Sequence, residues 1–218
     1  MRRLLARRSQ RGQSLVEFAM ILPVIMFLLL GMVEMGFAIN HNTSIVTATR
    51  QGARVGAELV NGSSKTGHPC SDSSGAATVD PQIIAAVEGV LTSPGSPVAV
   101  SQVTQIVIFE VKDDGTAAHN MTPSGNKNVW VSSVDGTGHP TGTLLPGSTT
   151  QHMYFAPGTP SSYPASGRCG TAPASGIGIS ITYTYKFITP LGAIVASLGA
   201  SQIQMTDQTT MALEPPSP

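Results

Sequence analysis

One glutamate in this sequence lies beside a long apolar run, where a carboxylate needs a positively charged partner. Glu17 precedes sixteen uncharged residues, Phe18 to Val33, and the next basic residue is Arg50. An unpaired charge deep in a bilayer helix costs about 2.5–3.5 kcal/mol on insertion scales, so such a carboxylate needs a partner. Cleavage after Gly12 would create one, because the new α-amine of Gln13 would lie four residues before Glu17 on the same helical face. That amine, or the same amine of a neighbouring subunit, could neutralise the carboxylate.

The apolar run itself predicts a helix that crosses a membrane. With Glu34 tolerated near its end, the run extends from Phe18 to Ile39, which is twenty-two residues. At about 1.5 Å per residue, this length spans the roughly 30 Å hydrocarbon core of a bilayer. We expect Glu34 to lie near the opposite interface, about 26 Å from Glu17 along the helix, where water can solvate it.

The basic residues predict the orientation of this helix. Positive residues are held on the cytoplasmic side of a membrane, so we expect the N-terminus inside and all residues after Ile39 outside. Five arginines precede the apolar run: Arg2, Arg3, Arg7, Arg8 and Arg11.

A simpler interpretation gives Glu17 no role. A basic start and a hydrophobic helix also describe an ordinary signal peptide or signal anchor, and Gly36-Phe37-Ala38 is an end that signal peptidase could accept. Glu17 would then lie at a helix N-terminus, where the macrodipole favours a carboxylate by about 0.3–1 kcal/mol. This alternative predicts a secreted or membrane-anchored binding domain, and Ile39 would be the first residue of the cleaved chain.

The residues around Gly12 resemble a known family. The run Gly12-Gln13-Ser14-Leu15-Val16-Glu17-Phe18, followed by Ala19, Leu22 and Pro23, is similar to the processing site of type IV pilin relatives in tight-adherence (Flp-type) pilus systems. It most closely resembles the TadE-like pseudopilins, and Arg50-Gln51-Gly52-Ala53-Arg54 continues the resemblance one helix-length later.

This resemblance implies a structural protein rather than an enzyme. A prepilin peptidase would cut between Gly12 and Gln13, Glu17 and Phe18 would act in assembly, and the membrane helix would contain Pro23 and Glu34. The implied partners are the peptidase, other pilin or pseudopilin subunits, the inner-membrane assembly platform and membrane lipid. The chain would cross the bacterial cytoplasmic membrane once, or lie in the pilus.

The composition describes an exported, loop-rich domain. Charged residues make up only 11% and aromatic residues 5% of the chain, whereas there are 23 glycines and 16 prolines. Removal of Met1 to Gly12 leaves seven basic and twelve acidic side chains. No excess of positive charge remains to attract nucleic acid, so we expect no nucleic-acid partner.

The two cysteines, Cys70 and Cys169, both follow the membrane helix, on the side where disulfides form and persist. We expect one bridge between them, with two free thiols as the alternative. Closing a loop of about 100 residues could stabilise the fold by up to about 4.7 kcal/mol in the chain-entropy model.

Periodicity predicts two helices. The first continues the membrane helix (13–39) through 40–60 and ends at Asn61-Gly62, with an apolar seam that packs on its own sheet or on neighbouring helices in a filament. The second follows Asp80-Pro81, an N-cap and a first-turn proline. The seam of the first helix consists of Ile45, Ala48, Gly52, Val55 and Leu59, and that of the second of Ile83, Ile84, Val87 and Leu91.

The strands follow from alternation of apolar and polar residues. We expect strands at 103–111, 177–187 and 203–213, with a turn at 113–115 and a crossover at 189–199. The last two strands should pair antiparallel and bury their apolar faces against the helix after residue 40. Between the first two of these strands, residues 116–176 predict long Gly/Pro/Ser/Thr-rich loops with short strands near 129–131 and 153–155.

These elements predict an α+β protein with a pilin-like domain. Its parts are a basic cytoplasmic leader (1–12), a transmembrane helix (13–39), a helix extension (40–60) and an exported α+β domain (61–218). The sequence has no recognisable catalytic motif, so we expect no enzyme activity, no cofactor and no metal site, with a membrane-anchored hydrolase as a third hypothesis. Histidines 41, 68, 119, 139 and 152 stand alone, and we expect them to be solvated.

Overall fold

The computed structural model describes residues 10–65, 75–113, 121–143, 152–163, 175–197, 199 and 202–213 of the 218-residue chain. The chain divides into two compact units. One consists of Met1–Ile39 with Lys186–Ile203, and the other of Asn40–Tyr185 with Gln204–Pro218.

The first helix is longer than predicted. Helix α1 (Gln10–Lys65) has 56 residues and continues past Asn61-Gly62, so the predicted end was wrong. An interior glycine costs only about 1 kcal/mol relative to alanine and asparagine costs less. The helical turns on either side can offset this small cost, so the helix continues through both residues.

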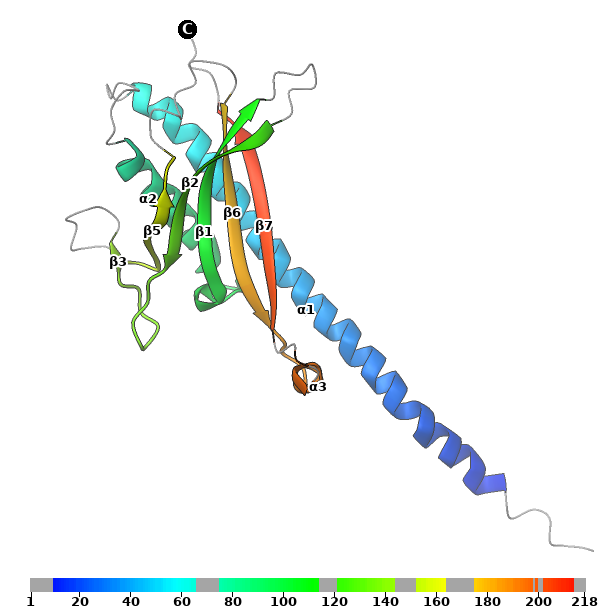
Figure 1. Cartoon of the computed structure of the whole chain (residues 1–218). Helices are drawn as coiled ribbons and strands as arrows, with labels where there is room; N and C mark the ends of the chain where they lie inside the picture. Colours follow the sequence, from blue (N-terminus) through cyan, green and yellow to red (C-terminus); the bar gives the residue numbers. More distant parts are fainter. Residues whose placement is uncertain are drawn as a thin grey trace, which may run out of the picture. The chain divides into compact units, whose positions relative to one another are not determined.

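The second unit contains most of a five-stranded sheet in the order β5-β2-β1-β6-β7 (Figure 1). Strand β1 pairs antiparallel with β2 and β6, and β2 pairs antiparallel with β5. The strands are β1 (Val103–Asp113), β2 (Met121–Ser132), β5 (Phe155–Ser161), β6 (Ser175–Lys186) and β7 (Gln202–Ala212). The long N-terminal helix and the antiparallel sheet confirm the predicted α+β fold.

The other elements lie outside the five-stranded sheet. Helix α2 (Gly75–Leu91) is followed by a single 3-10 turn, Val100–Gln102, and α3 (Leu191–Ser197) lies between β6 and β7. Strands β3 (Gly142–Thr143) and β4 (His152–Met153) form a separate antiparallel pair. The sequence predicted the crossover after β6 but not the helix within it.

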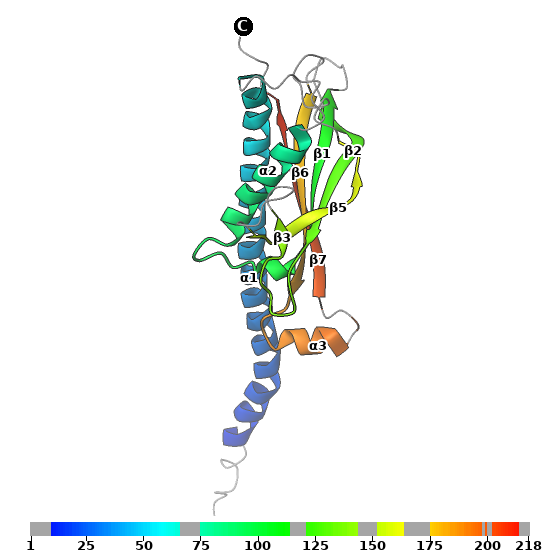
Figure 2. The same cartoon turned by 90° about the vertical axis from the view of Figure 1, so that its left-hand side faces the viewer.

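One face of the sheet is covered by α2 and by the part of α1 that follows Asn40 (Figure 2). Both predicted seams face inward, and Ile45, Ile83 and Val87 are fully buried. Two glycines let the layers approach closely: a Cβ on Gly52 would lie 2.7 Å from Val87 Cγ2, and one on Gly56 would lie 2.8 Å from Ile177 Cδ1. This part of the α1 seam therefore packs on its own domain.

Strand β6 is the centre of this core, whereas β7 is only partly buried. The apolar side chains of β6 from Ile177 to Tyr185 are at most 1% exposed, as the alternation predicts. Ile203 of β7 is 41% exposed, so the predicted burial of that residue was wrong. Strand β7 is an edge strand and meets α1 through polar atoms instead, because the Thr49 hydroxyl lies 2.9 Å from Asp207 Oδ2.

The short strand predicted near 129–131 is the end of a longer one, β2, which has twelve residues and lies between β1 and β5. Its first half, which includes Pro123 and Gly125, has residues that rarely occur inside sheets. The strand tolerates them because β5 pairs with it only from Asn128 onward, which leaves the first half at an open edge. Gly125 also takes a φ of +91°, where glycine is favoured.

The predicted N-cap at Asp80 was also wrong. Helix α2 begins at Gly75, so Asp80 and Pro81 lie inside it. The carboxylate of Asp80 is buried and accepts a hydrogen bond of 2.7 Å from Asn128 Nδ2 of β2. The Asp80 carboxylate therefore bonds to a distant strand, whereas the local sequence had predicted that it caps the N-terminus of the helix.

Gly178 of β6 tests the packing of the sheet. It lies opposite Phe109 of β1, and a Cβ there would overlap the ring of Phe109. We expect Gly178→Ala to lower the free energy of unfolding by roughly 1–3 kcal/mol through overpacking. Urea unfolding of the full chain in detergent, followed by the fluorescence of the single, buried Trp130, measures this change.

Gly89→Ala is the matched control. Gly89 lies in α2, and a Cβ there would meet no atom within 4 Å, so alanine should raise the free energy of unfolding by about 0.5–1 kcal/mol. Equal stability of the two variants would contradict the contact between Phe109 and Gly178.

Glu88 makes the stability of the domain depend on pH. Its carboxylate on α2 accepts backbone N–H bonds from Tyr154 at 2.8 Å and Phe155 at 3.2 Å. Burial raises the pKa of Glu88 from 4.5 to about 7, against the lowering effect of these two bonds. The folded state therefore holds a proton more tightly than the unfolded state does.

A carboxyl with a raised folded-state pKa contributes full stability below its unfolded pKa and loses that stability as pH rises through its folded pKa. We expect the unfolding midpoint in urea to fall between about pH 4.5 and pH 7 because of Glu88. Glu88→Gln keeps a carbonyl acceptor and has no charge to bury, so it should flatten this dependence. An unchanged slope in the variant would assign the dependence to another group.

Candidate functional site in the first helix

The first half of α1 exposes its apolar side chains in all directions. From Gly12 to Asn40, Glu34 is the one residue that the chain buries. Large side chains there are up to 73% exposed, as at Met32. Among the described residues, Gly12–Leu59 is the one helix long and apolar enough to cross a membrane. A surface of this kind is stable only against lipid or other apolar partners.

Gln13 and Glu17 share one face of this helix. The side-chain amide of Gln13 donates a hydrogen bond of 3.1 Å to Glu17 Oε1, and both residues are exposed. The spacing of four residues thus places them together, as predicted. The pairing of Glu17 with the α-amine of a cleaved chain stays a prediction.

Gly12, Phe18 and Pro23 make few contacts within the chain. A Cβ on Gly12 would meet no atom within 4 Å, and Phe18 is 60% exposed. Pro23 lies inside the helix, where it lacks the N–H that would bond to the carbonyl of Ala19. The folded chain gives no packing reason for these residue types, so any requirement for them comes from outside it.

Glu34 is not solvated, and the expectation from the sequence was wrong. It is 6% exposed, and its Oε1 and Oε2 accept backbone N–H bonds from Ile188 at 3.0 Å and Thr189 at 2.9 Å. Glu34 and these two residues belong to the same compact unit. The donors are backbone groups more than 150 positions away, so no side-chain pattern could have indicated them.

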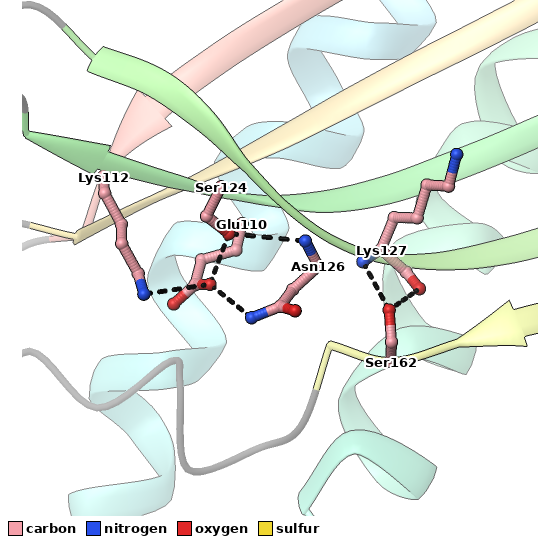
Figure 3. Close-up of polar contacts among 6 residues, drawn as sticks. All are labelled: Glu110, Lys112, Ser124, Asn126, Lys127 and Ser162. Carbon is pink, nitrogen blue, oxygen red and sulfur yellow. Dashed lines mark hydrogen bonds and ion pairs between the residues drawn. The ribbon is translucent and has the colours of Figure 1, made fainter.

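A second polar cluster lies on β1 and β2 (Figure 3). The buried carboxylate of Glu110 accepts hydrogen bonds from the Ser124 hydroxyl and from Asn126 Nδ2 at 2.8 Å, and Lys112 Nζ lies 3.6 Å from it. Next to this cluster, Ser162 Oγ accepts a hydrogen bond from the backbone N–H of Lys127 and donates one to the backbone carbonyl of Lys127. No sequence motif indicates this cluster, because its members belong to two strands and meet only when β1 pairs with β2.

The geometry of the Glu110 cluster is that of a structural network. Its serine donates to a carboxylate that also receives an amide and an ammonium group, so these donors serve to satisfy one buried charge. A serine nucleophile needs an adjacent base that can take its proton, usually an imidazole. Ser124 Oγ donates a hydrogen bond to the Glu110 carboxylate and accepts one from the backbone N–H of Asn126, and neither partner is an imidazole. We therefore assign the cluster to holding β1 and β2 together.

The histidines do not form one site in the part of the chain that the structure describes. His41 is buried on α1 and stands edge-on to Tyr185 at 5.2 Å between ring centroids, so its predicted solvation was wrong. His139 is exposed in a turn with Asp135, whose pKa falls to about 2 because Thr137 and His139 donate hydrogen bonds to it. Within the described ranges, no three His, Cys, Asp or Glu side chains gather as metal ligands would.

The remaining predicted residues lie outside the described part of the chain. These are Cys70 and Cys169, with His68 and His119. The disulfide therefore stays a prediction.

Comparison with known proteins bears on α1 alone. Residues 12–54 match the family described as TadE-like protein. No curated protein and no solved structure was found to match the chain. The matched stretch begins at the glycine before Gln13 and ends at Arg54, the last residue of the segment that resembled the family in the sequence. Over residues 12–54, the first helix of this chain is therefore similar to the TadE-like proteins, a family associated with pili.

Proposed function

We propose that this chain is a minor pilin or pseudopilin of a tight-adherence (Flp-type) pilus. It is held in the bacterial cytoplasmic membrane by residues 13–39, with residues 1–12 in the cytoplasm, and residues 40–60 continue the helix into an exported domain, 61–218. It acts in pilus assembly or adhesion as a structural subunit, without catalysis. The observation that carries this proposal is the family match over residues 12–54, in register with the Gln13 and Glu17 pair.

The partners follow from the exposed half of α1. A prepilin peptidase cuts after Gly12, and the apolar side chains then face membrane lipid before they face the helices of other pilin or pseudopilin subunits. The inner-membrane assembly platform moves the subunit between these two states. Nucleic acid is not among the proposed partners, because the mature chain has more acidic than basic side chains.

The ordinary signal-peptide alternative receives less support. Cleavage after Ala38 would remove Glu34 from the chain. The backbone N–H groups of Ile188 and Thr189 would then lose the carboxylate that accepts their hydrogen bonds. These hydrogen bonds join residues on both sides of that cleavage point, so they favour a chain that keeps this part of α1.

Processing gives the first test of this proposal. We expect the mature chain to begin at Gln13, because Gly12 precedes the residues that match the family. Mass spectrometry of the N-terminal peptide from membranes that contain the peptidase measures this directly. A chain that begins at Ile39 would establish the signal-peptide alternative.

Glu17→Gln gives the second test, since it removes the charge and keeps the shape. A hydrogen bond to a charged group contributes about 1.5–3 kcal/mol, so loss of the pairing with a neighbour's α-amine should weaken subunit association roughly tenfold or more. Membrane insertion should persist, because a neutral residue enters the bilayer more easily. Counts of pili and surface adherence should fall while the processed protein accumulates in the membrane.

Glu58→Gln is the matched control on the same helix. Glu58 is an exposed carboxylate that pairs with Arg54 at 2.8 Å, and exposed pairs of this kind contribute about 0.3–0.5 kcal/mol. We expect normal piliation in this variant. Normal piliation in Glu17→Gln cells, with the protein at wild-type levels, would remove the assembly role of Glu17.

A further inference from the structure

Exposed apolar side chains gather in the segment Lys186–Ile203, which we call the crossover segment. Outside α1, the described chain exposes five large hydrophobic side chains, and three of them lie in this segment. They are Ile188, Ile194 and Ile203, which are 56%, 48% and 41% exposed. The segment contains no acidic residue, and its one charged residue is Lys186, which is exposed. Such a composition is typical of a surface that enters a lipid headgroup layer.

Glu34 sets the position of the crossover segment along α1. Its two carboxylate oxygens bind the backbone N–H groups of Ile188 and Thr189, and all three residues belong to one compact unit. Glu34 comes directly after the uncharged run Phe18–Val33, seventeen residues beyond Glu17. This separation corresponds to about 26 Å along a helix, close to the thickness of the hydrocarbon core. The hydrogen bonds therefore hold the crossover segment at the far end of the apolar run.

The direction of α3 is consistent with a surface position. Helix α3 is seen nearly end-on in Figure 1 and side-on in Figure 2, where it lies across the direction of α1. A short helix across a membrane-spanning helix, at the end of its apolar run, lies along the plane of the membrane. Ile194 is in this helix, and Ile188 precedes it.

We propose that the crossover segment lies on the outer surface of the phospholipid membrane and inserts Ile188 and Ile194 among the headgroups. This inference rests on the membrane anchoring in the proposed function and adds a second lipid contact to it. Lys186 faces the phosphates, and Glu34 holds the segment at this depth through the backbone. The bonds to Ile188 and Thr189 also satisfy a carboxylate and two amides where water is scarce. The bound ligand is a phospholipid surface rather than a protein.

Quenching of added tryptophans by brominated lipids tests this position. The full-length protein is reconstituted into phosphatidylcholine vesicles whose acyl chains carry bromine either near the headgroup or near the bilayer centre. We expect the added emission of Ile194→Trp to be lost mainly with the shallow bromines. Leu28→Trp, in the middle of the apolar run, should be quenched mainly by the deep ones. Val134→Trp, at an exposed site in the other unit, and the wild-type protein with its buried Trp130 give the baseline.

The role of Glu34 needs a second variant. Glu34→Ala in the Ile194→Trp background should reduce quenching by the shallow bromines, because the segment loses its attachment to α1. Quenching of Leu28→Trp should not change with the same substitution. Glu58→Gln, which removes an exposed carboxylate from the same helix, should leave both signals as they are.

The outcomes separate this inference from the function on which it rests. If Leu28→Trp is quenched and Ile194→Trp stays at the baseline, the chain is anchored but the crossover segment does not touch lipid, and its apolar side chains face another protein. If Leu28→Trp also stays at the baseline, membrane anchoring itself is wrong. Strong quenching of Ile194→Trp that Glu34→Ala does not change would overturn the attachment through Glu34.

Discussion

Close contact between α1 and its neighbours at two glycines is the constraint on which the folded domain depends. Gly52 and Gly56 leave no room for a side chain, because Val87 of α2 and Ile177 of β6 occupy the space. Hydrophobic burial grows with the apolar area removed from water, and interiors are close-packed, so the two layers must meet at this distance. Strand β6 then lies directly beneath the helix and brings β1 and the rest of the sheet with it.

The same helix therefore has two kinds of surface. Up to Ile39, large apolar side chains project outward and the chain covers almost none of them. From Asn40 onward, small residues such as Ala48 and Ala53 face the core and are fully buried. Large side chains suit contact with lipid or with other subunits, whereas small ones suit the approach of a sheet. The match to TadE-like protein covers residues 12–54 and so includes parts of both surfaces.

Buried carboxylates connect segments that are distant in the sequence. Glu34 binds backbone amides of the crossover segment, Asp80 binds Asn128, and Glu110 binds two side chains of β2. Glu88, which is half-buried, binds the amides at the start of β5. A buried charge is tolerated only when hydrogen bonds compensate for lost water. Each carboxylate therefore specifies one arrangement of its partners. These contacts fasten the irregular parts of the chain, where regular sheet pairing is limited.

The sequence by itself determined what depends on local pattern. The length of the apolar run predicts α1, the period of two predicts β1, β6 and β7, and the glycine before Glu17 indicates the family. The tertiary structure decided what depends on partners. Strand β2 forms despite Pro123 and Gly125 because β1 supplies its hydrogen bonds, and the helix continues through Asn61-Gly62 because local preferences are weak.

The charged residues show this division most clearly. Glu17 could be interpreted from its neighbours in the chain, since its partner lies four residues away on the same helix. Glu34 was expected to be solvated by water, yet its partners are backbone amides, which almost every residue carries. Sequence patterns report side chains at short, regular spacings. The burial of Glu34 arises from chain folding over a long separation, and only the three-dimensional structure contains that information.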